Sequence, residues 1–303
     1  MRFRIGTFNV NNLFDRFDDP FTEDVVYRGR STVQKQLIVR HHTARRILKN
    51  RPDVLALQEV ENRRALWEFN EGHLGRYFSY LALVEANDIR GIDVAVASRV
   101  PLGRVVTHQF RHDRRSPRRD HLVFSRDLLH VEILHRRRLR VMFHLFVTHL
   151  KSSYTPYRRP SERWRKKRDE NNAWRKLQAE TVRDIIKETF SDPLDTPYVV
   201  AGDLNDGPTS EFLVPLLGPE SGLELYNPLV DWPLEQRTTH EHTERWTENG
   251  ERHRDVHDEQ YDYLLLSPPL RDRIEPGSVR VESRVGPKEE SSDHNPVFLT
   301  LNL

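Results

Sequence analysis

The sequence predicts an α/β protein in which short strands and amphipathic helices are mixed along a single domain of residues 1–303. Three observations predict this class. Apolar runs of strand length recur along the chain, segments with helical spacing lie between them, and polar side chains follow the carboxyl ends of several runs. Two polar stretches, 111–120 and 233–260, are predicted as loops within the domain, because motif-like strand ends occur on both sides of each.

The strands are predicted from short apolar or alternating segments. In chain order they are residues 4–10, 54–57, 92–97, 128–134, 139–148, 198–201, 262–266 and 297–301. Residues 33–49 have a helical apolar stripe that Pro52 ends, and a second strong helix surrounds residues 174–185. Asn62 is expected to cap a short helix that carries Ala65, Leu66 and Phe69.

The composition excludes several classes of protein. Hydrophobic residues make up 36% of the chain and the aromatic content is sufficient for a core, so a wholly disordered chain is not expected. The apolar runs are too short for membrane insertion. The absence of cysteine excludes disulfides, thiolate zinc sites and a cysteine nucleophile. The N-terminus lacks the apolar stretch of a signal peptide, so we expect a cytoplasmic protein.

The charge is nearly balanced overall but is segregated locally. The net charge is +2, from 48 basic and 46 acidic residues, whereas 111–119, 136–140 and 158–168 are strongly basic. Such runs could attract a polyanion, or could be solvated loops. The His240-Glu241-His242 segment in the second predicted loop is expected to be solvated.

Polar residues at the strand ends predict one shared pocket. Alone, each has a simpler explanation as a turn residue or a helix cap. Their combination carries the prediction: five clusters follow or precede apolar strands, and they contain Asn9, Gln58 and Glu59, His149, Asp203 and Asn205, and Asp293 to Asn295.

The ordered set of motifs resembles the endonuclease/exonuclease/phosphatase superfamily, whose fold is that of pancreatic DNase, from residue 5 to about residue 300. Within it, the chain is similar to a bacterial group that begins YNVENLFD and carries RGIDVAL, with Asn11 at the position of the Glu. The motifs are FNVNNLFD (8–15), LQEVEN (57–62), RGIDVA (90–95), THLKS (148–152), GDLND (202–206), DYLLLS (262–267) and SDH (292–294). The resemblance implies a four-layer α/β/β/α sandwich of two mixed sheets, with the site at one end.

A hard divalent cation fits this residue set. Oxygen ligands without thiolates suit Mg²⁺, with Mn²⁺ as the alternative, better than structural zinc. By motif position, the resemblance implies that Glu59 is the principal metal ligand. Asn9 would supply an amide oxygen to the metal or contact phosphate, and Asp293 is a candidate second ligand.

The resemblance also implies roles in the reaction for five residues. Asp203 would align or deprotonate the attacking water, and Asn205 would hold a phosphate oxygen. His294 would polarise phosphate or share in activating the water, with Asp262 fixing its tautomer. His149 would donate to a phosphate oxygen or assist the leaving group.

Lys151, Asp93 and Arg126 complete the set as substrate-binding candidates. Lys151 adds positive charge beside His149. Asp93 alternates with Ile92 and Val94 and needs a partner if it points inward. Arg126 could be that partner or could contact phosphate, and a purely structural ion pair is an equal alternative.

We favour a metal-dependent nuclease acting on DNA or RNA, because the basic runs 111–119 and 158–168, with Tyr154, Tyr157 and Trp164 interleaved, suit a nucleic-acid backbone with bases that can stack. The alternatives are a phosphatase or phosphodiesterase of small or lipid-linked phosphates, such as an inositol-phosphate or sphingomyelin hydrolase, and a binding module that keeps the fold. Nucleic acid is the expected partner, and no obligate protein partner is indicated.

Overall fold

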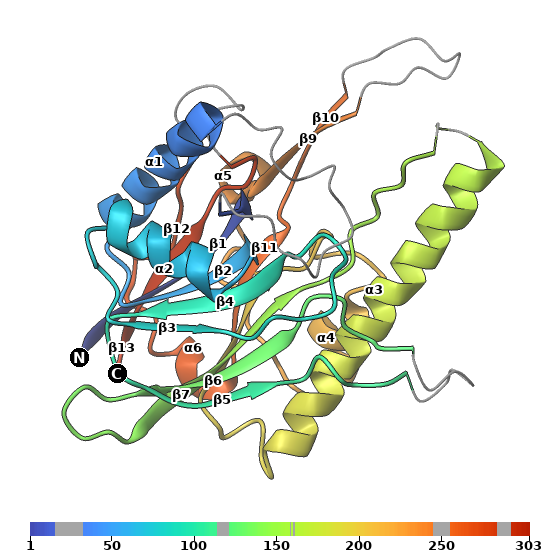
Figure 1. Ribbon diagram of the computed structural model, residues 1–303. Helices are drawn as coiled ribbons and strands as arrows, with labels where there is room; N and C mark the ends of the chain where they lie inside the picture. The colour runs from blue at the N-terminus through green and yellow to red at the C-terminus, as the bar shows by residue number, and fades with distance from the viewer. Residues whose placement is uncertain (16–32, 114–120, 158, 160, 245–254, 284–291) are drawn as a thin grey trace.

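Two mixed β-sheets form the centre of the molecule (Figure 1). The computed structural model describes residues 1–15, 33–113, 121–157, 159, 161–244, 255–283 and 292–303. The first sheet has the order β12 (Arg280–Val281), β13 (Val297–Asn302), β1 (Arg2–Leu13), β2 (Val54–Val60), β4 (Asp93–Ser98), β3 (Tyr80–Leu83). The second has the order β11 (Asp262–Leu266), β8 (Tyr198–Asp203), β7 (Val141–His149), β6 (Leu128–Leu134), β5 (Leu102–Thr107). A separate hairpin consists of β9 (His240–Glu244) and β10 (Asp255–Glu259).

The helices cover the outer faces of both sheets. In Figure 1, α1 and α2 lie over the first sheet and α3 lies over the second. None of the helices in the described ranges is both long and apolar enough to cross a bilayer. The helices are α1 (Val33–Asn50), α2 (Arg63–Gly72), α3 (Glu162–Thr189), α4 (Val214–Leu217), α5 (Leu234–Arg237) and α6 (Pro268–Arg271), with a 3₁₀ turn at Pro219–Ser221.

Three hydrophobic clusters hold the layers together. One, with Phe69 of α2, lies under the helices of the first sheet. The second lies between the sheets and includes Leu145, and the third, with Val182 of α3, lies outside the second sheet. Strand residues alternate between clusters: Val54 of β2 faces the inter-sheet core, whereas Leu55 faces the helices. The predicted four-layer α/β/β/α sandwich is therefore confirmed.

The predicted strands are present with small changes of boundary, but several short elements were not predicted. β3 and β5 were not predicted, because both are edge strands with incomplete burial. The prediction of a loop at 233–260 was wrong, since α5, β9 and β10 lie within it. The sequences of β9 and β10, HEHTE and DVHDE, contain one apolar residue between them and so carry no alternating pattern. Residues 114–120 of the other predicted loop lie outside the described residues.

Gly202 allows β7 and β8 to pair closely beside the site. Its φ is +143°, and a Cβ at this position would lie 1.8 Å from the backbone oxygen of Thr148. We expect Gly202→Ala to lower the free energy of unfolding by roughly 3 kcal/mol or more, measured by urea denaturation. Gly207→Ala is the control, because a Cβ at Gly207 meets nothing within 4 Å. Equal unfolding midpoints for Gly202→Ala and the unmodified protein would contradict this packing argument.

Candidate active site

Six of the predicted side chains converge where the strands of the two sheets end: Asn9, Glu59, His149, Asp203, Asp262 and His294. The first sheet pairs Asn9 with Gln58 in parallel register. The second sheet pairs His149 with Asp203 in parallel and Asp262 with Asp203 in antiparallel register. The two parallel pairs bring the carboxyl ends of four strands together, which places the polar residues on a rigid platform.

The Asn9 side chain connects the two sheets. Its Nδ2 donates to Asp203 Oδ2 at 3.0 Å and to Glu59 Oε1 at 3.5 Å, and lies 3.4 Å from His294 Nε2. Its Oδ1 accepts the backbone N–H of Asn11 at 3.0 Å. The amide nitrogen, and not the oxygen, therefore faces the cluster, which favours phosphate contact over metal ligation among the two roles predicted for Asn9.

Glu59 is directed toward this cluster by an irregularity in β2. The register of β2 shifts between Gln58 and Val60, and Glu59 between them has a φ of +63°. A left-handed backbone is uncommon for glutamate and is typical of bulges next to functional sites. The backbone N–H of Asn12 donates to Glu59 Oε2 at 3.1 Å and fixes the carboxylate. Asn205 at the end of β8 also has a positive φ, +55°.

His294 and Asp262 form a buried pair. His294 Nδ1 donates to Asp262 Oδ2 at 2.8 Å, which is the predicted contact and leaves Nε2 directed at Asn9 and Asp203. Burial alone would lower the pKa of His294, but the carboxylates of Asp262 and Asp203 raise it to about 10. His294 is therefore an imidazolium at neutral pH, and its Nε2–H is a charged donor.

Asp203 stays ionised although it is buried. Burial would raise its pKa, but His294, His149 and the bond from Asn9 together hold the pKa of this carboxyl well below its usual range. His149 Nε2 lies 3.3 Å from Asp203 Oδ2. Burial and the nearby Arg126 lower the pKa of His149, so this second imidazole is neutral at pH 7.

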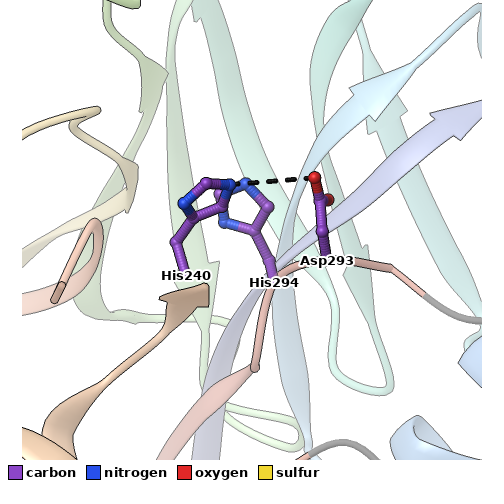
Figure 2. A group of neighbouring side chains, drawn as sticks. All are labelled: His240, Asp293 and His294. Atoms are coloured by element: carbon purple, nitrogen blue, oxygen red, sulfur yellow. Dashed lines mark ion pairs between the residues drawn. The ribbon is translucent and has the colours of Figure 1, made fainter. Parts of the chain in front are cut away.

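Asp293 and His240 lie beside His294 (Figure 2). Asp293 accepts a bond from Asn11 Nδ2 at 2.9 Å and lies 3.7 Å from His240 Nε2. The His240 ring is 4.4 Å from that of His294 and stacks on Tyr261 at 5.1 Å. The expectation of a solvated His240 was wrong, because the pairing of β9 with β10 brings the start of β9 over the site. The side chains of residues 241 and 242 lie outside the described set.

Asn205 and Lys151 flank the cluster. Asn205 Nδ2 donates to the backbone oxygen of Leu150 at 2.9 Å, and its N–H donates to Asp203 Oδ1 at 2.8 Å. In this arrangement Asn205 stabilises the end of β8. Burial, and after it the neighbouring Arg126, lowers the pKa of Lys151 to about 8, whereas Asp88 opposes the shift.

Arg126 pairs with Asp88, and not with Asp93 as one alternative from the sequence had it. Arg126 Nε donates to Asp88 Oδ2 at 3.0 Å, and Nη1 donates to the backbone oxygen of Leu150 at 3.0 Å. The Arg126 guanidinium therefore stabilises the position of the segment that follows His149. No local sequence pattern indicates Asp88 as the partner, because the contact depends on how the connection 84–92 folds back toward Arg126.

Asp93 is buried, with the backbone N–H of Ala86 donating to Oδ1 at 2.9 Å. Burial raises its pKa to about 8 from an ordinary 3.8. Between these pH values the native state holds a proton that the unfolded state releases, so stability falls as the pH rises. A neutral carboxyl can also donate a hydrogen bond to phosphate.

Asp93→Asn keeps the acceptor for Ala86 and removes the ionisable group. We expect it to raise the free energy of unfolding at pH 7 by roughly 1–4 kcal/mol, with the gain vanishing near pH 4, as measured by urea denaturation across this range. A gain that does not change with pH would contradict the buried-carboxyl argument. Hydrolysis assays on the same variant separate a structural role from substrate binding.

The residues around Glu59 fit a divalent cation. Glu59 Oε1 has only the long contact to Asn9, and the buried Oδ1 of neighbouring Asn12 has no hydrogen-bond partner among the described residues. Ligand atoms of two overlapping groups, Asp203–Asp262–His294 and His240–Asp293–His294, also lie within 4.8 Å of one another. Both groups contain His294, whose ring would have to lose its proton to bind a metal. The Glu59 carboxylate offers oxygen donors, which suit a hard cation.

Comparison with known proteins shows the family to which the chain belongs. The sequence model of the endonuclease/exonuclease/phosphatase family matches residues 6–294, so the chain belongs to that family. No curated protein matches the sequence. Among solved structures, TDP2 of D. rerio complexed with single-strand DNA product has a TM-score of 0.61 at 16% identity, covering 100% of this chain and 99% of that one. Truncated TDP2 of Caenorhabditis elegans has a TM-score of 0.59 at 17% identity, covering 99% of this chain and 97% of that one. Beta toxin 275-280 of Staphylococcus aureus has a TM-score of 0.57 at 14% identity, covering 98% of this chain and 99% of that one.

The structural likeness shows the fold, and family membership defines the class of chemistry. The protein is a phosphoric-ester hydrolase of a family whose enzymes use divalent metals. The strand ends described above are where the site of such an enzyme is expected in a layered α/β protein.

Proposed function

We propose that the protein is a Mg²⁺-dependent nuclease that cleaves phosphodiester bonds of DNA or RNA by in-line attack of water. One observation carries the proposal: His294, held by Asp262 at 2.8 Å, lies 3.7 Å from Asp203, and Asn9 links this group to the carboxylate of Glu59. This arrangement combines a positive donor for phosphate, an acceptor for water and an anchor for a cation.

Each group has a distinct part in the proposed reaction. Glu59 would hold the cation, which would supply positive charge to the phosphate and to the negative charge that develops on the leaving oxygen. His294 Nε2–H donates to a phosphate oxygen, and Asn9 Nδ2 orients the same group. Asp203 accepts a hydrogen bond from the attacking water. Asp203 also takes the proton of that water as the water oxygen bonds to phosphorus. The bond from phosphorus to the leaving oxygen breaks on the opposite side, and the leaving oxygen keeps the electron pair and takes up a proton from solvent.

The preference for nucleic acid rests on the basic, aromatic segment beside the site and on the single-strand DNA product named for the D. rerio relative. Hydrolysis of small or lipid-linked phosphates would use the same groups at phosphorus. Specificity for one of these substrates therefore depends on the loops around the site and not on the groups that act at phosphorus.

A substrate panel tests the proposal. Plasmid, single-stranded DNA, RNA, bis-p-nitrophenyl phosphate and inositol phosphates are each incubated with Mg²⁺, Mn²⁺ or EDTA, and with the Glu59→Gln variant as the control for contaminating nucleases. Cleavage of nucleic acid that is lost in EDTA and in the variant supports the nuclease. Turnover of phosphomonoesters with intact nucleic acid, or no turnover of any substrate, would overturn it.

A further inference from the structure

The first turns of α3 are exposed to solvent on nearly all sides. Residues 161–170 contain no buried side chain, and only Trp164 and Lys167 are partly covered. The first buried residue of α3 is Asn171. Figure 1 shows this end of α3 standing clear of the sheets, at the same end of the molecule as the β9–β10 hairpin. A helix segment that is polar all round has no apolar face to pack on the core. We call residues 161–170 the α3 ridge.

The α3 ridge belongs to a strongly basic segment. Residues 151–168 contain eight Lys and Arg and a single acidic residue, Glu162. Lys167 has an exposed partner in Glu170 at 3.2 Å, a contact that contributes little. No described acidic residue forms an ion pair with Arg163, Arg165 or Lys166. Their charge is therefore available to an anionic partner.

Aromatic rings are interleaved with these charges. The guanidinium of Arg168 lies 4.6 Å from the centre of the Trp164 ring, and that of Arg159 lies 5.1 Å from it. These contacts order both arginines and cover the indole. Tyr154 and Tyr157 are exposed, and Asn171 Nδ2 donates to the backbone oxygen of Tyr154 at 2.8 Å, which fixes the tyrosine segment to α3.

The ridge is joined to the candidate active site. Arg175 Nη1 of α3 donates at 2.8 Å to the backbone oxygen of Lys151, two residues after His149. Lys151 Nζ lies 5.8 Å from the ring of Trp174, also on α3. Lys167 also helps to lower the pKa of Lys151, though less than burial, Arg126 and Arg90 do. Positive charge thus continues from the site to the ridge.

We infer that the α3 ridge, together with Tyr154 and Tyr157, binds a single-stranded part of a nucleic acid next to the bond to be cleaved. The inference rests on the proposed function for the place of that bond. Arginine and lysine contact the backbone phosphates, and the tyrosines stack on bases. An anionic membrane is the weaker occupant, because the indole that would enter lipid is covered by two guanidinium groups.

Binding without cleavage tests the inference on the full chain. Fluorescence anisotropy of a labelled oligothymidylate of about 20 nucleotides is measured in EDTA over a range of salt concentrations. The test variant carries Arg163→Glu, Arg165→Glu and Lys166→Glu. The matched control reverses the same number of charges, Arg136→Glu, Arg137→Glu and Arg138→Glu, in the exposed β6–β7 turn away from the site.

We expect the ridge variant to bind at least about tenfold more weakly with a shallower salt dependence, and the control to stay within about twofold. Tyr154→Ala should weaken binding without changing the salt dependence, because it removes stacking alone. The inference would be overturned if the ridge variant bound the oligonucleotide as tightly as the unmodified protein, or if both triple variants lost the same affinity. It would also be overturned if binding that depends on the ridge were found for phosphatidylserine vesicles but not for the oligonucleotide.

Hydrolysis of bis-p-nitrophenyl phosphate separates this inference from the proposed function. The ridge variant should hydrolyse this small diester like the unmodified protein, which also shows that it is folded. If the protein binds the oligonucleotide through the ridge yet cleaves no nucleic acid, the proposed nuclease activity is contradicted and binding by the ridge is supported. If the protein cleaves nucleic acid and the ridge variant cleaves it equally well, binding by the ridge is contradicted and the nuclease activity is supported.

Discussion

The Glu59→Gln variant is expected to lose metal-dependent hydrolysis of phosphodiesters by at least about 10³-fold in kcat/KM. Glutamine keeps an oxygen for the Asn12 N–H, which donates to Glu59 Oε2 at 3.1 Å, so the bulge in β2 should persist. It removes the negative charge, and the electrostatic attraction for a divalent cation disappears with that charge. Initial rates with bis-p-nitrophenyl phosphate at saturating Mg²⁺ measure the effect.

A second glutamate gives the matched control. Glu68 lies on α2, where it pairs with Arg64 at 3.0 Å outside the site, and Glu68→Gln should retain the original rate. Circular dichroism and the thermal midpoint of both variants show whether the fold is intact. Near-normal turnover by folded Glu59→Gln with Mg²⁺ would remove the metal role from this carboxylate.

His294→Ala should lower kcat by about 10³-fold or more, because it removes the charged donor next to Asp203. Asp262→Asn should cost less, since the imidazole stays in place. Asp262 is the main cause that raises the pKa of His294 to about 10. Without that carboxylate, burial lowers the pKa of His294, and the ring loses its proton at a lower pH. The alkaline limb of the pH–rate profile should therefore move to lower pH in Asp262→Asn.

The pH profile distinguishes this role from a structural one. His41→Ala, an exposed change on α1, serves as the control and should leave both rate and profile unchanged. An Asp262→Asn enzyme with full activity and an unchanged alkaline limb would show that Asp262 does not set the protonation of His294.

Local patterns predicted much of the fold. The alternation in 92–97 and the apolar stripe in 33–49 gave strands and helices close to the observed β4 and α1, and the Asn62 cap is confirmed, with its side chain accepting from Ala65 N at 2.8 Å. The arrangement into two sheets came from the resemblance, since nothing local specifies which strands pair across the chain.

The composition of the site was predicted better than its geometry. Strand-end positions identified Asn9, Asp203 and His294 because their apolar neighbours place them at the edge of the core. The positive φ of Glu59 could not be predicted, because no glycine or asparagine marks the bulge. The position of His240 over His294 depends on a polar hairpin that buries no patterned face, and the Arg126–Asp88 pair depends on contact between two loops.

Mn²⁺ binding followed by electron paramagnetic resonance tests the central claim most directly, because it detects the cation at Glu59 without substrate. The unmodified protein should remove free Mn²⁺ from solution, Glu68→Gln should do so equally, and Glu59→Gln should have lost at least one bound ion. Identical Mn²⁺ binding by folded Glu59→Gln and the unmodified protein would contradict a metal centre on this carboxylate and the mechanism built around it.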